Sequence, residues 1–179
     1  YQHLTLKIVC VNMSDFNSIV KKIQQNFLKE LPGLPAQLKM APTFSSGNNF
    51  SSTPNITTRQ SAVLIGIYQK DFNAHTILIK RSVYDGLHSG QVSFPGGKHE
   101  ELDTDLVSTA LREANEEIGI NPKDVKIIGT LTPLYIPVSN MMVLPVVGLI
   151  PEPKNLKLNL QEVEYTIELS LMHLKDKAN

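Results

Sequence analysis

The chain has 179 residues, of which 41% are hydrophobic and 19% are charged, and its 17 basic residues balance its 17 acidic ones. This composition excludes an extensively disordered chain, and the length favours a single domain. A formal net charge of zero argues against binding to nucleic acid through bulk electrostatics. The single cysteine, Cys10, excludes an internal disulfide, and no apolar run is long enough to span a membrane. We therefore expect a cytoplasmic protein with no membrane partner.

The first part of the chain, residues 1–60, is interpreted as an N-terminal extension. Residues 1–12 precede the first methionine, and we expect them to be a remnant or a mis-set start. Apolar residues then recur at helical spacing and predict an amphipathic packing helix over about 14–31, with Pro32-Gly33 as its stop signal. Residues 41–60 are rich in Ser, Thr, Asn, Pro and Gly and predict a loop.

The remainder, residues 61–179, changes to strands around one long helix. The helix is predicted over about 103–118, because Gly119 directly follows the last residue of its pattern. Pro145 lies inside one of the strands and predicts an edge position or a bulge. Strands and helices mixed without regular alternation predict an α+β fold with a mixed sheet. The predicted strands span 62–68, 76–79, 125–131 and 142–150.

The helix over 103–118 has two different faces. Its apolar residues form one stripe that must face a core, whereas Glu113, Glu116 and Glu117 form a second stripe at spacings of three and four residues. Like charges at such spacings cost about 0.2–0.5 kcal/mol per pair, and the C-terminal half of a helix disfavours anions. A bound divalent cation would reverse both effects, and carboxylate oxygens suit Mg²⁺ or Mn²⁺. The alternative is an ordinary solvated acidic face.

Two neighbouring features support a site at this helix. The segment Phe94-Pro95-Gly96-Gly97 precedes it, and glycines allow the main chain to approach a ligand closely. The carbonyl of Gly97 could therefore join the same metal. Arg112 could orient the acidic residues through charged hydrogen bonds.

The sequence from Arg112 to Ile120, REANEEIGI, resembles the second half of the Nudix box, R-E-U-x-E-E-x-G-U with U apolar. In the first half, Gly97 lies one residue too early and Thr104 stands where the box has a Glu, so this box carries a one-residue insertion. The segment over 77–97, ILIKRSVYDGLHSGQVSFPGG, is similar to the motif L-L-T-x-R-S-x-x-L-R-x-H-x-G-Q-V-A-F-P-G-G of coenzyme A pyrophosphatase-like Nudix proteins. Asp85-Gly86 replaces the Leu-Arg pair of that motif.

The resemblance implies a Nudix-like α/β/α layered fold over 61–179 and hydrolysis of a nucleoside diphosphate linkage. The implied substrate is coenzyme A or a derivative, cleaved to 3′,5′-ADP and a phosphopantetheine. The missing Arg of the motif keeps ADP-ribose or NADH as an alternative, and a non-catalytic nucleotide sensor is a third. The expected partner is thus a small nucleotide, and a homodimer is left open. Such proteins usually continue into a further strand and a closing helix, which we expect to be missing here.

The resemblance also implies roles for the acidic residues. Arg112 would orient the carboxylates, and the general base would be either Glu113 or Glu164. Glu164 belongs to the segment QEVE, which is similar to an E-V-x-E element of the family. The implied ligands of Mg²⁺ or Mn²⁺ are Glu113, Glu117, Glu116 (directly or through water) and the carbonyl of Gly97.

Four residues of the upstream motif are implied to bind substrate. Arg81 would bind phosphate, because a guanidinium matches phosphate oxygens. Gly96 would let the main chain approach the ligand. His88 and Gln91 each have two interpretations, a contact with the substrate or bracing of the glycine-rich turn.

Overall fold

The computed structural model describes residues 16–39, 53–83, 85 and 88–175. Its helices are α1 (Phe16–Phe27), α2 (Gly33–Lys39) and α3 (Leu106–Ile118). Its strands are β1 (Arg59–Lys70), β2 (Asn73–Arg81), β3 (Val92–Ser93), β4 (Gly96–Lys98), β5 (Lys126–Thr130), β6 (Leu134–Ile136), β7 (Met141–Leu149) and β8 (Val163–Ser170).

The strands form one mixed sheet, in which β3, β2, β1, β7 and β5 are neighbours in that order. β1 and β7 run parallel, from the pair Arg59–Met141 to the pair Ile67–Leu149. The remaining pairs are antiparallel, and β8, β4 and β6 add to β2, β1 and β7 respectively. The predicted mixed sheet and α+β class are confirmed.

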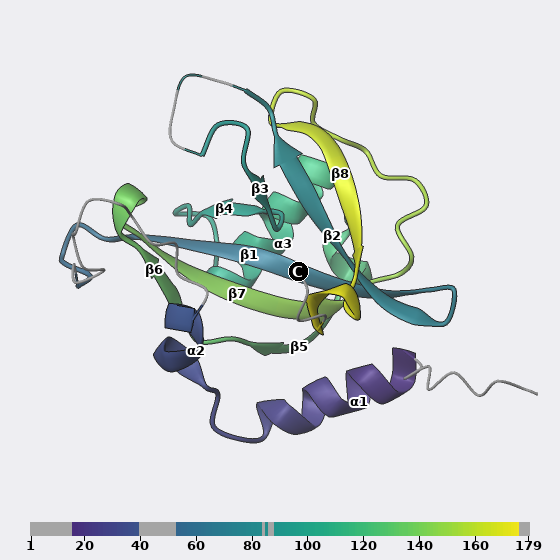
Figure 1. Cartoon of the computed structure of the whole chain (residues 1–179). Coiled ribbons are helices and arrows are strands. Elements are labelled where there is room, and N and C mark those ends of the chain that lie inside the picture. Colours follow the sequence, from purple (N-terminus) through teal and green to yellow (C-terminus); the bar gives the residue numbers. More distant parts are fainter. Residues whose placement is uncertain (1–15, 40–52, 84, 86–87, 176–179) are drawn as a thin grey trace, which may run out of the picture.

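The sheet divides between β1 and β2, and this division positions the glycine-rich segment. β1 and β2 pair only near their connecting turn, from Ile67–Thr76 to Lys70–Asn73. Further along, β1 pairs with β4 and β2 pairs with β3. The chain between residues 92 and 98 therefore enters the gap between the two diverging strands, as Figure 1 shows.

Alternation along β1 separates two apolar cores, one on each face of the sheet. Leu64 faces α3, whereas Ile65 and Ile67 face the opposite side with Ile19 of α1. Figure 1 shows α3 behind the sheet and α1 along its lower margin. The core residues contributed by α3 are Ala110, Ala114 and Ile118. The predicted apolar stripe of this helix and the α/β/α layering are thus both present.

Both ends of α3 have a clear local cause. Asp105 is the N-cap: its carboxylate accepts a hydrogen bond of 2.7 Å from the N–H of Ser108, and the Ser108 hydroxyl accepts one of 3.0 Å from the N–H of Asp105. At the other end Gly119 is left-handed, with φ 75°. The helix starts three residues later than predicted because Asp103 has another role, described below.

The N-terminal helix ends earlier than predicted. α1 ends at Phe27, whose ring lies against Gly129 of β5, and does not reach Leu31. The next residue, Leu28, is 88% exposed, so the apolar face no longer meets the sheet beyond Phe27. The supposed remnant, residues 1–12, lies outside the described residues.

The expected stop signal Pro32-Gly33 instead begins α2, which the sequence did not predict. Gln37 of α2 anchors it by donating to the carbonyls of Thr132 and Pro133 at 3.0 and 3.2 Å. The loop predicted over 41–60 extends too far, because its last two residues belong to β1. None of the helices in the described part of the chain is long and apolar enough to cross a membrane.

Pro145 does not lie at a sheet edge, so the first of its two interpretations is wrong, and the register shift nearby lies in β5, between Ile127 and Gly129. Its strand, β7, has β1 on one side and both β5 and β6 on the other. The pairs with β6 end at Val143 and those with β5 begin at Val146, which places Pro145 at the junction. Its carbonyl accepts a hydrogen bond of 2.9 Å from Leu131. The missing N–H of proline therefore falls between the two partner strands.

The core between α1 and the sheet predicts a difference between two truncations. Ile19→Ala should lower the free energy of unfolding by about 2–4 kcal/mol, because Ile19 is only 6% exposed and its loss leaves a cavity. Leu28→Ala should change it by less than about 0.5 kcal/mol. Urea denaturation measures both, and equally small effects would contradict the packing of α1 on the sheet.

Candidate active site

A buried carboxylate joins three elements at the division of the sheet. The side chain of Glu117, on α3, has no exposed surface, and its Oε1 lies 3.0 Å from Nη2 of Arg81 at the end of β2. Its Oε2 accepts a hydrogen bond of 2.8 Å from the N–H of Gly96 on β4. The same Nη2 of Arg81 donates to the carbonyl of Gly96 at 2.6 Å. Glu117, Arg81 and Gly96 thus form a closed set of contacts.

Only glycine fits at position 96. Gly96 has a φ of +156°, and an added Cβ would lie 2.3 Å from the carbonyl oxygen of Ala62. The close approach expected of this residue is therefore an approach to β1 and to Glu117. Its N–H and its carbonyl both have protein partners here.

The carboxyl group of Glu117 has a pKa well above that of an ordinary glutamate. Burial raises the pKa of Glu117 to about 7, although the guanidinium of Arg81 and the N–H of Gly96 oppose the rise. The charges of Glu113 and Glu162 raise this pKa further. Oε1 of Glu117 has no hydrogen bond, since its contact with Arg81 has ion-pair distance without hydrogen-bond geometry. This carboxylate is therefore not fully compensated.

Glu113 lies one turn before Glu117, and its carboxylate faces Gly97. A Cβ on Gly97 would lie 2.4 Å from the carboxyl carbon of Glu113, so the carboxylate occupies the space that a side chain would fill. Nη2 of Arg112 lies 3.1 Å from Oε1 of Glu113, whose side chain is 14% exposed. Burial raises the pKa of Glu113, and Arg112 lowers it.

The third acid of the stripe lies apart from the other two. The Glu116 side chain is 52% exposed and accepts a hydrogen bond of 2.8 Å from Nη1 of Arg112. The three carboxylates that share a stripe in the sequence thus have distinct surroundings. Their repulsion is partly balanced by Arg81 and Arg112, which the argument from helical spacing did not include.

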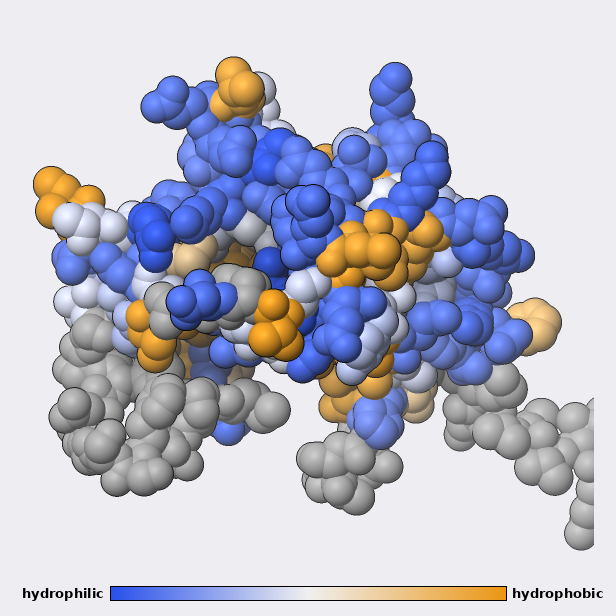
Figure 2. Space-filling view, turned by 90° about the horizontal axis from the view of Figure 1, so that it is seen from above, coloured by the Kyte–Doolittle hydropathy of each residue, from blue (hydrophilic) through white to orange (hydrophobic). Residues whose placement is uncertain are grey.

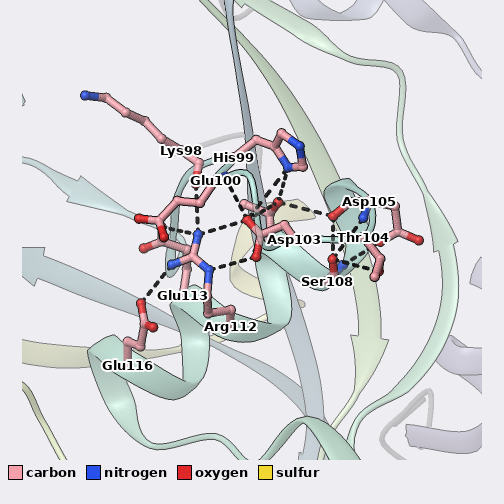
Figure 3. A network of polar contacts seen from close by, with 11 residues as sticks. Lys98, His99, Glu100, Asp103, Thr104, Asp105, Ser108, Arg112, Glu113 and Glu116 are labelled. Atoms are coloured by element: carbon pink, nitrogen blue, oxygen red, sulfur yellow. Dashed lines mark hydrogen bonds and ion pairs between the residues drawn. The ribbon is translucent and has the colours of Figure 1, made fainter.

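Arg112 connects the helix to the loop before it (Figure 3). Its Nε and Nη2 donate to Asp103 at 2.8 and 3.1 Å, and Nη2 also donates to the carbonyl of Lys98 at 2.9 Å. Asp103 is only 4% exposed and also accepts from Thr109 and from the N–H of Glu100. Arg112 holds the pKa of Asp103 well below its usual range. The arginine that touches Glu113 and Glu116 is therefore itself fixed from behind.

Asp103 fits one of the acidic positions that follow the motif over 77–97, but the sequence reasoning gave it no role at the site. Counting along the Nudix box placed Thr104 at the position of the earlier acid, but the Thr104 hydroxyl contacts Ser108. The one-residue insertion is absorbed in the loop, so that Asp103 supplies the carboxylate to Arg112. The signal was the presence of an acid directly beside the expected position.

A cavity of about 610 Å³ adjoins these residues. Its lining includes Arg81, Gly97 and Glu113 together with Arg59 and Ser139. The view from above in Figure 2 shows a mainly hydrophilic surface with apolar residues in small separate groups. The cavity is thus a cleft with a charged end where α3 meets β4.

His88 and Gln91 also line the cleft, and their side chains contact each other. Nδ1 of His88 lies 2.9 Å from Oε1 of Gln91, and His88 is left-handed with φ 68°. The main chain of the same turn is tied to β2, since the carbonyl of Gln91 accepts from the N–H of Arg81 at 2.9 Å. This geometry includes the bracing contact and also leaves both residues at the cleft wall.

Glu164 does not join the cluster. It lies on β8 with an exposed side chain, whereas the neighbouring Glu162 is the acid whose charge acts on Glu113 and Glu117. Both acids belong to the segment over 161–164 that resembles the family element. The spacing of the element already pointed to Glu162, because its first Glu directly precedes Val and Glu162 directly precedes Val163.

The donors present at the charged end suit a divalent cation. Glu113 supplies carboxylate oxygens beside Gly97, and Glu117, which accepts from the N–H of Gly96, has an Oε1 without a hydrogen bond. Within the described residues, no three His, Cys, Asp or Glu side chains converge as metal ligands. Glu116 contacts Arg112 instead. The carboxylates that fit a cation here are therefore those of Glu113 and Glu117, and the carbonyl of Gly97 stays a predicted ligand.

The family model described as NUDIX domain matches residues 58–166, and the chain therefore belongs to the Nudix family. Among its relatives, a protein of Escherichia coli O6:H1 named uncharacterized Nudix hydrolase NudL is 41% identical over 113 residues, which are 63% of this chain and 58% of that protein. The protein of the same name from Enterobacter sp. is 40% identical over 116 residues, 65% of this chain and 59% of that one. The match thus spans less than two thirds of these relatives.

Solved structures resemble the same region. An Ap4A hydrolase of C. elegans, in a binary complex, has a TM-score of 0.54 at 18% identity and covers 65% of this chain and 82% of its own. The NUDIX domain of Shewanella oneidensis NrtR, complexed with ADP ribose, has a TM-score of 0.50 at 17% identity and covers 66% and 76%. At these identities the likeness shows the fold alone.

The contact between Asp103 and Arg112 predicts a pH-dependent loss of stability. Asp103→Asn should lower the free energy of unfolding at pH 7 by about 1–3 kcal/mol, because Arg112 loses its buried partner. The pKa of Asp103 is depressed by folding, so its contribution is present above about pH 4 and is lost as the pH falls. The difference between wild type and variant in urea should therefore shrink towards about pH 2.5.

Asp124→Asn is the matched control, because Asp124 is exposed in the short turn Pro122–Asp124. It should change stability by less than about 0.5 kcal/mol at any pH. A difference between wild type and Asp103→Asn that stays constant over the whole pH range would contradict the ion pair.

Proposed function

We propose that this chain hydrolyses a nucleoside diphosphate linkage with the help of Mg²⁺ or Mn²⁺. One observation carries the proposal: the Glu113 carboxylate faces Gly97 in a cleft that Arg81 also lines, and the buried Glu117 lies behind it against Arg81 and Gly96. The cavity of about 610 Å³ lies in the size range of small-molecule sites. A diphosphate at this end would meet both the arginine and the cation held by the carboxylates.

A divalent cation bound here would neutralise phosphate oxygens and lower the pKa of a bound water. The protein's own part is to place and orient the reacting groups. Arg112 fixes Glu113 and Glu116, and Arg81 offers a guanidinium to the phosphate. As water attacks phosphorus, the anhydride P–O bond breaks and a carboxylate takes the proton of the water. Glu113 is the acid best placed for this step, whereas Glu164, the alternative expected from the sequence, is exposed on β8 and lies outside the cluster.

Coenzyme A or a derivative is the substrate we propose, with 3′,5′-ADP and a phosphopantetheine as products. Support comes from the motif over 77–97, in which Arg81, His88, Gln91 and Gly96 match the coenzyme A pyrophosphatase-like pattern. The Asp85-Gly86 replacement keeps ADP-ribose or NADH as a second candidate, and the NrtR domain that resembles this fold was solved with ADP ribose. A nucleotide sensor without catalysis is the third.

If a cation binds at Glu117, it should restore the stability that the ionised Glu117 costs the fold at high pH. The pKa of Glu117 is raised to about 7 by burial, so without metal the wild type should lose stability as the pH rises from about 4.5 through 7. Relative to Glu117→Gln, this loss should amount to about 3 kcal/mol. Saturating Mg²⁺ at pH 8 should raise the free energy of unfolding of the wild type by about 2–3 kcal/mol and leave that of Glu117→Gln unchanged.

Urea unfolding with and without Mg²⁺ measures both effects. Glu101→Gln serves as the control, because Glu101 is exposed and lies outside the cluster, and it should behave as the wild type does. Equal stabilisation of Glu117→Gln and wild type by Mg²⁺ would show that the ion binds elsewhere.

Product analysis tests the reaction. With Mg²⁺, we expect coenzyme A to yield 3′,5′-ADP at a kcat/KM at least tenfold above those for NADH, ADP-ribose and diadenosine substrates. Turnover of another member of this panel but not of coenzyme A would remove the proposed substrate and leave the proposed reaction. No turnover of any member would contradict hydrolysis.

The sensor alternative is separated from the enzyme by one variant. Glu117→Gln should lower kcat by about a thousandfold or more, while the protein stays folded. A sensor would show no turnover in the wild type, and its nucleotide affinity would hardly change in the variant. Calorimetric titration with ADP provides the affinity.

A further inference from the structure

Glu117 has an internal cation as its neighbour. The Glu117 carboxylate has no exposed surface, and the group 3.0 Å from Oε1 is Nη2 of Arg81, which is 21% exposed. Oε2 is already used by the N–H of Gly96. Oε1 is therefore the oxygen of Glu117 that another cation could take, and it is the oxygen that Arg81 approaches.

We infer that Arg81 and the divalent cation compete for Glu117, and that Arg81 exchanges this carboxylate for the phosphate of the substrate when the cation binds. The inference rests on the proposed function, since it concerns the same site. It assigns Arg81 a second role besides phosphate binding, as the counter-ion that a metal must displace from Oε1.

The surroundings of Arg81 suit such an exchange. Arg81 is the last residue of β2, next to a register shift between Lys80 and Arg81 in the pairing with β8. Its main chain is fixed by the carbonyl of Gln91, but its side chain lines the cleft. A turn of the guanidinium from Glu117 towards the cleft would also break its hydrogen bond to the carbonyl of Gly96, but it needs no change in the strand.

The charges of the cation and of the substrate both favour movement of the Arg81 guanidinium from Glu117 to the cleft. A divalent cation at Glu113 and Glu117 would repel a guanidinium 3.0 Å from Oε1 of Glu117. A diphosphate in the cleft would attract the same guanidinium, which presents parallel donors to phosphate oxygens. Metal and substrate would therefore each favour the position of Arg81 that the other needs, and their binding would be coupled.

Binding of Mn²⁺ alone provides the test. Arg81→Gln should bind Mn²⁺ at least tenfold more tightly than wild type, because the competitor of the metal is removed, while the KM for the hydrolysed substrate should rise at least tenfold. Removal of Arg81 also raises the proton affinity of Glu117, so calorimetry is done at about pH 8.5. If Arg81 had only a structural role, its replacement would weaken the binding of both Mn²⁺ and substrate. Tighter Mn²⁺ binding together with a higher KM therefore identifies the exchange.

Arg59→Gln is the matched control, since Arg59 lines the same cleft but donates to the carbonyl of Ser139 at 2.7 Å. It should change Mn²⁺ affinity by less than twofold. If Arg81→Gln does not fold, Arg81→Lys tests the inference instead. A single ammonium cannot reproduce the contacts of Arg81 with both Glu117 and the carbonyl of Gly96. The Mn²⁺ affinity of Arg81→Lys should rise about threefold, and no rise would overturn the inference.

Unchanged or weaker Mn²⁺ binding by folded Arg81→Gln, with wild-type turnover intact, would overturn the inference and leave the proposed function standing. Failure of the proposed function looks different. In that case wild type and variants would show neither Mn²⁺ binding nor turnover of any panel member, and both proposals would be lost.

Discussion

The site depends on one unfavourable arrangement, an ionisable carboxylate with no exposed surface on the last turn of α3. Burying such a charge is costly unless it is paired. Glu117 is paired through two elements distant in sequence, the end of β2 and the start of β4. The compensation is incomplete, because burial still raises its pKa to about 7 and one oxygen has no hydrogen bond. This geometry destabilises the fold when no cation is bound, and a divalent cation beside Oε1 would offset that cost.

The fold supplies the arrangement through the division between β1 and β2. Because these strands separate after a short stretch of pairing, the segment over 92–98 can pair with each of them and bring Gly96 and Gly97 to α3. Asp103 and Arg112 then fix the helix relative to that segment. The charged end of the cleft is thus shaped by the main chain of β4, against which the acidic side chains of α3 lie.

Much of this could be predicted from sequence, because periodicity records which faces are buried. The apolar stripe of α3, the mixed sheet and the Nudix resemblance all rest on local patterns, and the structure and the family match agree with them. Relations between distant residues could not be predicted in this way. Helical spacing groups Glu116 with Glu117, yet one is exposed and the other is buried, because β4 covers only one side of the helix. In the same way, counting positions favoured Thr104 over Asp103, since no motif records how a loop absorbs an insertion.

The central claim is that Glu113 and Glu117, together with the carbonyl of Gly97, hold a hard divalent cation at the end of the cleft. Anomalous diffraction from crystals containing Mn²⁺ locates such an ion directly. The account predicts a peak within about 2.1 Å of an oxygen from each of these three residues, with the guanidinium of Arg81 no longer against Oε1 of Glu117. A protein that binds Mn²⁺ only elsewhere, with Arg81 still against Glu117, would contradict it.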